Sequence, residues 1–453
     1  MKLRYITFWV FLLAFSSLLG CKKFLEEKPR SNLAVPSSLK DFQALLDQSN
    51  VMNDLDAASG EASATDCYLT TANFLSRTEW QQRMYTWQTS EVYDRITNEW
   101  ANLYNVVYRA NTVISGIDEV ELTTTNAAEW RNVKGQAHFY RGKMFLLGLS
   151  IWSKAYHPTT AATELGIPLR LNVNFNETSV RSSQATSYAQ VLADLTSAAQ
   201  LLPNVPVHVM RPSKPAAYAL LSRLYLQMGN FEKASLYADS CLAIRSELID
   251  YNTLNVASNF PIAAFGKEVI HSSMVQLLST INPSTARIDP LLYASYSDND
   301  LRKTVFFLRN SDGTYRFKGS YQGSANLFSG LATDEMYLNR AECKARLGQQ
   351  ELALQDLNLL LRNRYKTGTF VPYTLANTTD VLKLVLEERR KELLMRNLRW
   401  ADIKRLNILG AGITLERTVN GQTYLLPANS PRFAAPIPEV VIELSGMPQN
   451  KYD

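Results

Sequence analysis

Two stretches of this sequence gather aromatic and polar side chains without a helical or strand period. They span residues 51–98 and 252–329. A ring offers a flat apolar face and a neighbouring Asn, Asp or Arg offers directed hydrogen bonds, so such a mixture can recognise a ligand. Long irregular segments beside a regular scaffold are also where binding residues often lie. The candidate ligand-binding rings are Tyr68, Trp80, Tyr85, Trp87, Tyr293, Tyr296 and Tyr321, with Asp66, Asn73, Arg77, Asp298, Asn299 and Arg302 as polar neighbours.

Core packing is the alternative explanation for each of these rings, because a chain with 22 Tyr and 7 Trp must bury many of them. Rings that recur every three or four residues are better explained as core. These are Trp100, Trp130, Tyr218, Tyr225, Tyr337 and Trp400.

Catalytic chemistry finds little support in the residue spacing. The four histidines, His138, His157, His208 and His271, form no HExxH or other paired pattern. The sequence has no GxSxG nucleophile elbow, no P-loop and no CxxC pair. Two carboxylates of the glycosidase type could still meet in the fold, but no spacing marks such a pair. We therefore predict a binding protein rather than an enzyme, with no cofactor and no metal site.

The elements that would position the rings are dominated by a helical hairpin that occurs twice, near 213–245 and near 332–363. Each copy has the order helix, Gly turn, helix, in which the Gly supplies a left-handed C-cap and a small Ala lets the second helix lie close. This is the tetratricopeptide (TPR) pattern, and one such hairpin needs neighbours to bury its apolar face. The matching positions are Tyr218 and Tyr337, Gly229 and Gly348, and Ala234 and Ala353.

Apolar periodicity predicts further helices over residues 38–48, 99–117, 127–152, 187–202 and 381–406. A third, interrupted hairpin is expected near 130–202, and residues 268–275 could form a strand. The last helix carries mixed charges at three- and four-residue spacing, which is typical of a solvated or salt-bridged face. The predicted fold class is mostly α: a TPR-type hairpin scaffold with long irregular loops and minor β structure.

The N-terminus has the features of a secretory signal. Lys2 and Arg4 precede an apolar run, and Leu18-Leu19-Gly20-Cys21 resembles a bacterial lipobox. We predict a signal peptide over residues 1–20, lipidation of Cys21, a polar tether over 21–36 and one domain over 37–453. Several acyl chains on one Cys give a lasting anchor, so the protein would be tethered to a membrane.

Composition and charge argue against a nucleic-acid-binding protein. The chain is 46% hydrophobic and 20% charged, as in an ordinary folded body. Its formal charge of +5 falls to about +3 once Lys2 and Arg4 leave with the signal, and no basic stripe is present, so we predict no nucleic-acid partner. Cys241 and Cys343 lie inside the repeats, where a buried thiol packs well. Whether they and Cys67 are all free thiols stays open at this point.

Taken together, these motifs resemble the SusD/RagB-like outer-membrane lipoproteins of Bacteroidetes-type bacteria. The resemblance covers essentially the whole chain, and its most specific parts are 387–393 (EERRKEL) and 399–405 (RWADIKR). The sequence departs from the family at 137–142 (AHFYRG), where relatives tend to have a charged FLRA stretch. The other matching segments are 21–29, 100–104, 109–111, 166–169, 267–270, 436–438 and 449–450.

The resemblance implies a TPR scaffold whose irregular loops bind oligosaccharide or polysaccharide outside the outer membrane. It implies anchoring by acyl chains such as palmitate at Cys21, and nutrient uptake in which the protein acts as a lid on a SusC-like TonB-dependent barrel. In some relatives the ligand is a peptide, and a scaffold that closes its transporter without a ligand of its own is a further alternative. The family's shared motifs do not contain its ligand contacts, so the resemblance identifies no binding residue.

Overall fold

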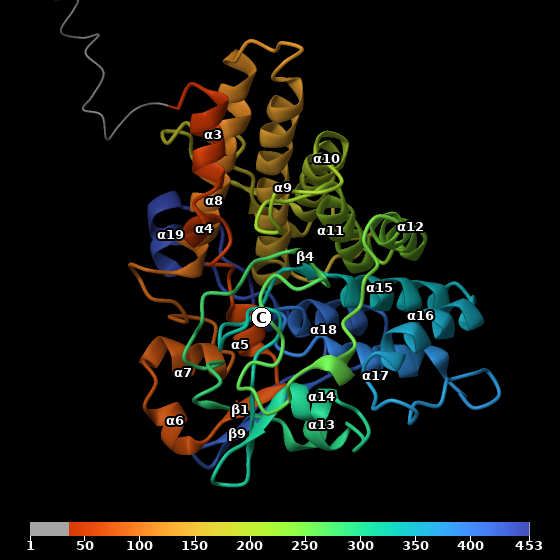
Figure 1. The fold of residues 1–453 in the computed structure, drawn as a ribbon. Helices are drawn as coiled ribbons and strands as arrows, with labels where there is room; N and C mark the ends of the chain where they lie inside the picture. Colours follow the sequence, from red (N-terminus) through yellow and green to blue (C-terminus); the bar gives the residue numbers. More distant parts are fainter. Residues whose placement is uncertain (1–35, 453) are drawn as a thin grey trace, which may run out of the picture.

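The structure is a computed structural model that describes residues 36–452, and in Figure 1 a stack of long helices stands beside and above a loop-rich region. The mostly helical prediction is confirmed. The scaffold helices are α3 (Leu39–Leu46), α8 (Glu99–Gly116), α9 (Ala127–Trp152), α10 (Gln184–Leu201), α11 (Lys214–Gln227), α12 (Phe231–Leu242), α15 (Thr333–Arg346), α16 (Gln350–Arg362), α17 (Val381–Glu392) and α18 (Arg399–Ile408).

The two Gly-containing hairpins are α11–α12 and α15–α16. Gly229 and Gly348 have φ of +73° and +79°, the left-handed conformation that ends the first helix of each pair. Ala234 and Ala353 are fully buried where the second helix approaches the first. Helix α12 packs against α15, so the two hairpins are neighbours in one stack although about ninety residues of chain separate them.

Helices α9 and α10 form the interrupted hairpin, packing along their length. Gly135 and Gly142 lie two turns apart on α9 and face α10. A Cβ at Gly135 would meet Leu201 at 3.0 Å, and one at Gly142 would meet Leu195 at 3.0 Å, so both glycines permit the close approach. The intervening chain forms the antiparallel pair β2 (Leu165–Pro168) and β3 (Arg181–Ser183).

The loop-rich region contains more regular structure than predicted for residues 51–98. Short helices occur there without any long apolar period, and at one of them, α6, the Thr70 side chain accepts from the backbone N–H of Asn73 and so caps the first turn. The helices of the loop-rich region are α4 (Ser49–Met52), α5 (Ser59–Ser63), α6 (Thr71–Leu75), α7 (Glu79–Tyr85), α13 (Pro290–Ala294) and α14 (Arg302–Val305).

Antiparallel two-stranded pairs tie distant segments together. Strand β1 (Cys67–Leu69) pairs with β5 (Ala286–Ile288) and so joins the two stretches that the sequence singled out. Of the strand predicted over residues 268–275, only Val269–His271 forms one, β4, which pairs with β8 (Leu331–Ala332) at the start of α15. Two local pairs complete the set: β6 (Phe307–Arg309) with β7 (Tyr315–Phe317), and β9 (Leu415–Val419) with β10 (Gln422–Leu426).

The charged segment 381–406 is two helices, which corrects the prediction of one. The chain breaks between α17 and α18, where Met395 and Asn397 have φ of 56° and 59°. Many of its charges also point inward, because oppositely charged residues from distant elements meet them there. The buried ion pairs include Arg302 with Asp300, Glu388 and Glu392, Arg364 with Glu268 and Glu392, Arg396 with Asp334, and Arg405 with Glu342 and Asp402.

Three of the four cysteines lie among the described residues, and Cys67, Cys241 and Cys343 are buried free thiols. No helix within residues 36–452 is long and apolar enough to cross a membrane. Over the same range, no group of three or more His, Cys, Asp and Glu side chains is placed to hold a metal ion. The predicted signal peptide, Cys21 and nearly all of the tether lie outside the described residues.

Candidate ligand-binding site

Four of the seven rings selected from the sequence are buried. Tyr85, Trp87, Tyr296 and Tyr321 expose 2%, 4%, 1% and 2% of their surface. A ligand cannot reach rings at this depth, so we do not retain these four as contacts. The sequence could not separate them from surface rings, because they lie in segments without a period that assigns a buried face.

Each buried ring has a structural role instead. Tyr85 and Trp87 enclose the guanidinium of Arg417, whose centre lies 3.9 Å and 4.9 Å from their ring centroids. The hydroxyl of Tyr296 donates to the carbonyl of Lys391 at 2.8 Å. The hydroxyl of Tyr321 contacts the carboxylates of Glu268 and Asp334. Burial raises the pKa of all three tyrosines, which keeps their hydroxyls neutral.

Tyr68, Trp80 and Tyr293 are half-buried and remain a proposal as ligand contacts. They lie on three different elements. Tyr68 lies on β1, Trp80 packs against the core from α7, and Tyr293 stacks on Tyr315 with 3.6 Å between ring centroids. One face of Tyr293 is therefore already occupied by a neighbouring ring.

The polar residues predicted beside these rings already have partners within the protein. Asp66 and Arg302 are buried in ion pairs, the first with Arg390 and the second with three carboxylates. Asn73 donates to the carbonyl of Thr285 and Arg77 donates to the carbonyl of Asn73. Asp298 pairs with Lys303, and the carbonyl of Asn299 accepts from the backbone of Lys366.

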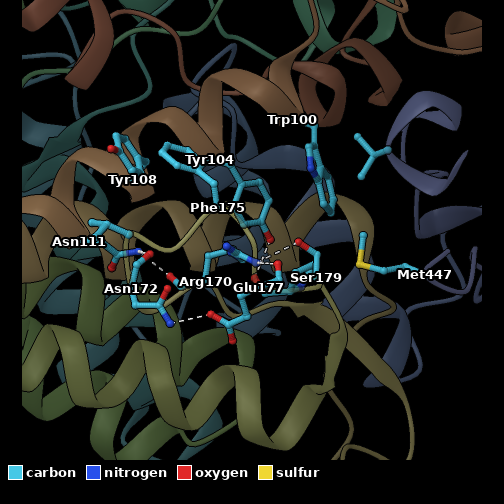
Figure 2. A pocket seen from close by; sticks show the side chains of 13 residues that line it. Trp100, Tyr104, Tyr108, Asn111, Arg170, Asn172, Phe175, Glu177, Ser179 and Met447 are labelled. Carbon is cyan, nitrogen blue, oxygen red and sulfur yellow. Dashed lines mark hydrogen bonds between the residues drawn. The ribbon is translucent and has the colours of Figure 1, made fainter. Parts of the chain in front are cut away.

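A cavity of about 310 Å³ opens elsewhere, beside α8 and the β2–β3 connection, and none of the seven rings lines it. Figure 2 shows Trp100, Tyr104 and Tyr108 along its aromatic side, with Phe175 opposite Tyr108. Asn111, Arg170, Asn172, Glu177 and Ser179 supply its polar groups. Val441 and Met447, from the C-terminal helix α19 (Glu439–Ser445) and the segment after it, close one end. This combination of ring faces and hydrogen-bonding groups suits a ligand with both hydroxyls and apolar faces, and the volume suits a small one.

One face of α8 supplies the aromatic side. Trp100, Tyr104 and Tyr108 follow one another at four-residue spacing, so their side chains align along the helix. The ring centroids of Trp100 and Tyr104 lie 4.9 Å apart. Trp100 exposes only 6% of its surface and also packs edge-on against Trp152 at 4.9 Å. It therefore belongs both to the core, as predicted, and to the cavity wall.

Tyr108 and Phe175 supply the accessible ring surface. Their exposed fractions are 37% and 77%, and their centroids lie 4.8 Å apart at an interplanar angle of 33°. Phe175 lies on the β2–β3 connection, where a ring this exposed gains little from burial. A ligand that covered it would remove apolar surface from water.

A chain of buried polar contacts holds the connection against the scaffold. Asp194 on α10 accepts two hydrogen bonds from Arg141 on α9, at 2.9 Å and 2.6 Å. Arg141 also donates to the side-chain oxygen Oδ1 of Asn111 at 2.9 Å, which leaves Nδ2 of the same amide to donate to the backbone carbonyl of Arg170 at 2.8 Å. Burial raises the pKa of Asp194, but hydrogen bonds from His138 and Arg141 outweigh it, so the net pKa lies below its usual value. The carboxylate therefore stays ionised at neutral pH, and this series of hydrogen bonds is maintained.

The connection is also braced from within. Arg170 donates to the carbonyls of Glu177 and Asn174 and lies 3.4 Å from the Ser179 hydroxyl. Asn172 donates to the Glu177 carboxylate at 2.6 Å. Figure 2 shows these contacts inside the cavity, where the same polar groups could also meet ligand hydroxyls.

This cavity was not predicted from the sequence, because its two sides lie far apart in the chain and neither side carries a binding motif of its own. The spacing of Trp100, Tyr104, Tyr108 and Asn111 was present in the sequence as one stripe on a helix, but such a stripe is also how a core face looks. Residues 170–180 are polar and lack the density of rings found in the other loops. Only the fold brings Phe175 to α8.

Residues 23–226 match the family model described as starch-binding and associating with the outer membrane, and residues 313–430 match the model of the SusD family. A search of curated proteins found no match.

Several solved structures share the fold. A provisionally named sugar-binding protein from Bacteroides vulgatus ATCC 8482 is 20% identical with a TM-score of 0.76, covering 93% of this chain and 100% of that one. A SusD superfamily protein from Bacteroides thetaiotaomicron VPI-5482 is 21% identical with a TM-score of 0.75, covering 91% and 100%. A SusD-like carbohydrate-binding protein from B. vulgatus is 20% identical with a TM-score of 0.62, covering 86% and 89%.

Proposed function

This chain belongs to the SusD/RagB-like family, and from this premise we propose that it binds oligosaccharide or polysaccharide, holding a short part of the ligand in the cavity beside α8. The single observation that carries the proposal is the pairing of the exposed rings of Tyr108 and Phe175 at the mouth of a cavity rich in amides and hydroxyls. Sugar rings present C–H faces that pack on aromatic rings and hydroxyls that need directed polar partners. The family is one of binding proteins, which supports a role without catalysis.

We further propose that the protein is a surface-exposed lipoprotein of the outer membrane that passes its ligand to a SusC-like TonB-dependent transporter. Support comes from the lipobox-like Leu18-Leu19-Gly20-Cys21 and from the description of the matched family as associating with the outer membrane. Replacing Cys21 by Ser should then release the protein from the membrane fraction into the soluble fraction. Continued sedimentation with lipid would contradict the anchor.

Calorimetric titration tests the ligand. The full chain, purified in detergent, is titrated with panels of neutral oligosaccharides and of peptides, and the variants Phe175→Ala and Tyr108→Ala are titrated with whatever binds. Each variant should weaken saccharide binding roughly threefold to tenfold, the range of one aromatic packing contact. Unchanged melting temperatures would show that the fold is intact.

Matched variants separate this cavity from the loops that the sequence favoured. Trp80→Ala, Tyr68→Ala and Tyr293→Ala remove half-buried rings outside the cavity. If these weaken binding while Phe175→Ala does not, the ligand lies on the loops and the cavity assignment is wrong. Binding confined to the peptide panel would instead favour the peptide-binding alternative.

A further inference from the structure

A second cavity, of about 670 Å³, lies on a different part of the molecule. Its walls come from the chain just after α9, from α18, from residues 429–433 and from the C-terminal tail. One wall is apolar, formed by Ile408, Pro431 and Phe433. Phe433 is buried and packs on Trp400 at 4.8 Å between centroids. The proposed sugar site uses none of these residues.

Positive charge dominates the lining of this cavity. Lys154, Lys404 and Lys451 line it together with His157, and Glu164 is its one carboxylate. Lys154 and Glu164 form an ion pair at 3.0 Å, which leaves the other two lysines as the excess. Among the described residues, the ammonium of Lys404 has only carbonyl partners, and neither Lys404 nor Lys451 forms an ion pair. A cavity with this balance attracts anions and repels cations.

Lys404 is the unusual member of this set, because it is a buried cation without a counter-ion. It exposes 5% of its surface, and its ammonium donates to the carbonyls of Ser150 and Ser153 at 2.6 Å and 2.5 Å. Those carbonyls end α9, so the contacts also cap that helix and fix the position of the ammonium. An ammonium has three donors, and two carbonyls leave one of them free. Burial also lowers its pKa to about 7, which an adjacent anion would oppose.

We propose that this second cavity binds the carboxylate of an acidic saccharide, with Lys404 and Lys451 contacting the anionic group. The exposed side chain of Ile408 and the half-buried Pro431 provide an apolar surface for the sugar ring, and the volume exceeds what a lone inorganic ion needs. The saccharide part of this inference rests on the function proposed above. The anion part rests on the charge balance of the cavity alone.

The test compares a charged disaccharide with its neutral counterpart. Digalacturonate and the neutral galactose disaccharide are titrated into the full chain in detergent, at low and high salt. We expect digalacturonate to bind, the neutral disaccharide to bind at least tenfold more weakly at this cavity, and added salt to weaken the charged probe. Equal affinity for both probes would overturn the proposal.

Charge variants locate the site. Lys451→Met removes an exposed lysine and should weaken digalacturonate about tenfold, whereas Lys40→Met, an exposed lysine on α3 outside the lining, should change nothing. Glu164→Gln removes the one carboxylate and should tighten binding, an effect that a purely structural role would not produce. Lys404→Met should cause the largest loss. If that variant does not fold, the affinities of Lys451→Met and Glu164→Gln for digalacturonate still show whether it binds in this cavity.

The proposal for the second cavity and the proposed function can be refuted independently of each other. If Phe175→Ala weakens digalacturonate while Lys451→Met and Glu164→Gln leave it unchanged, the acidic probe binds beside α8, and the second site is overturned with the proposed function intact. If neutral oligosaccharides of every kind fail to bind but digalacturonate depends on Lys451, the second site is supported as an anion site and the proposed function is lost.

Discussion

Arg364 and Glu268 form a fully buried ion pair, 2.9 Å from Nη2 to Oε1, that connects the end of the second hairpin to the start of β4. Arg364 also donates to Glu392 at 2.7 Å and to the carbonyl of Ile249 at 2.8 Å. One guanidinium thus joins the TPR scaffold, the charged helix α17 and the loop-rich region. Its carboxylate partners raise the pKa of Arg364 despite the cost of burial, so it stays charged.

Replacing Arg364 by Met should lower the free energy of unfolding by about 3–5 kcal/mol, because Glu268 would be left buried without a cation and Glu392 would keep only Arg302. Denaturant unfolding of the purified protein measures the change. The matched control is Arg95→Met, which breaks an exposed pair with Glu443 and should lower stability far less. Equal losses in the two variants would show that the buried network does not couple the three regions.

Glu61 should make stability depend on pH in the direction opposite to ordinary carboxylates. Burial, with Asp66 nearby, raises the pKa of Glu61 from 4.5 to about 8. Between these values the folded state holds a proton that the unfolded state has lost, so stability falls as pH rises. Relative to Glu61→Gln, the wild type should lose about 1.4 kcal/mol per pH unit across this window and nothing further above it. Urea unfolding from pH 5 to pH 9 measures both proteins.

The control for this series is Glu79→Gln, an exposed carboxylate on α7 whose removal relieves no burial. A plot of its free energy of unfolding against pH should run parallel to that of the wild type. If the plot for Glu61→Gln also ran parallel to that of the wild type, Glu61 would be ionised in the folded protein at neutral pH.

Gly166→Ala should disturb the proposed sugar site indirectly, by displacing strand β2. A Cβ at this position of β2 would lie 2.3 Å from the Ser187 hydroxyl and 2.7 Å from the Ser183 carbonyl, so the strand must shift. We expect a loss of about 1–3 kcal/mol in stability and weaker binding of neutral oligosaccharide, because β2 leads directly into the connection that carries Phe175. Thermal unfolding and calorimetry measure the two effects.

Gly148→Ala provides the comparison, since Gly148 faces the same strand from α9. A Cβ there would meet Ile167 at 3.5 Å, an ordinary contact. Alanine also favours a helix interior over glycine by about 0.5–1 kcal/mol, so this variant should be neutral or slightly stabilising. If both variants behave alike, steric pressure on β2 does not control the site.

The sequence by itself determined the scaffold, because helix periodicity and the Gly turns are local properties. Gly229 and Gly348 adopt the left-handed caps that their spacing predicts, and α11–α12 and α15–α16 lie where expected. A three- or four-residue apolar period needs only one buried face to be satisfied, whichever neighbour covers it. Family membership followed from the same local motifs.

Tertiary structure decided which rings and charges are accessible. Tyr321 and Phe175 look alike in sequence, yet one is buried against Glu268 and the other is 77% exposed beside Tyr108. Burial in a segment without a period depends on which distant elements pack over it. For the same reason the charges of α17 turned inward, because Arg302 and Arg364, far away in the chain, supplied their partners.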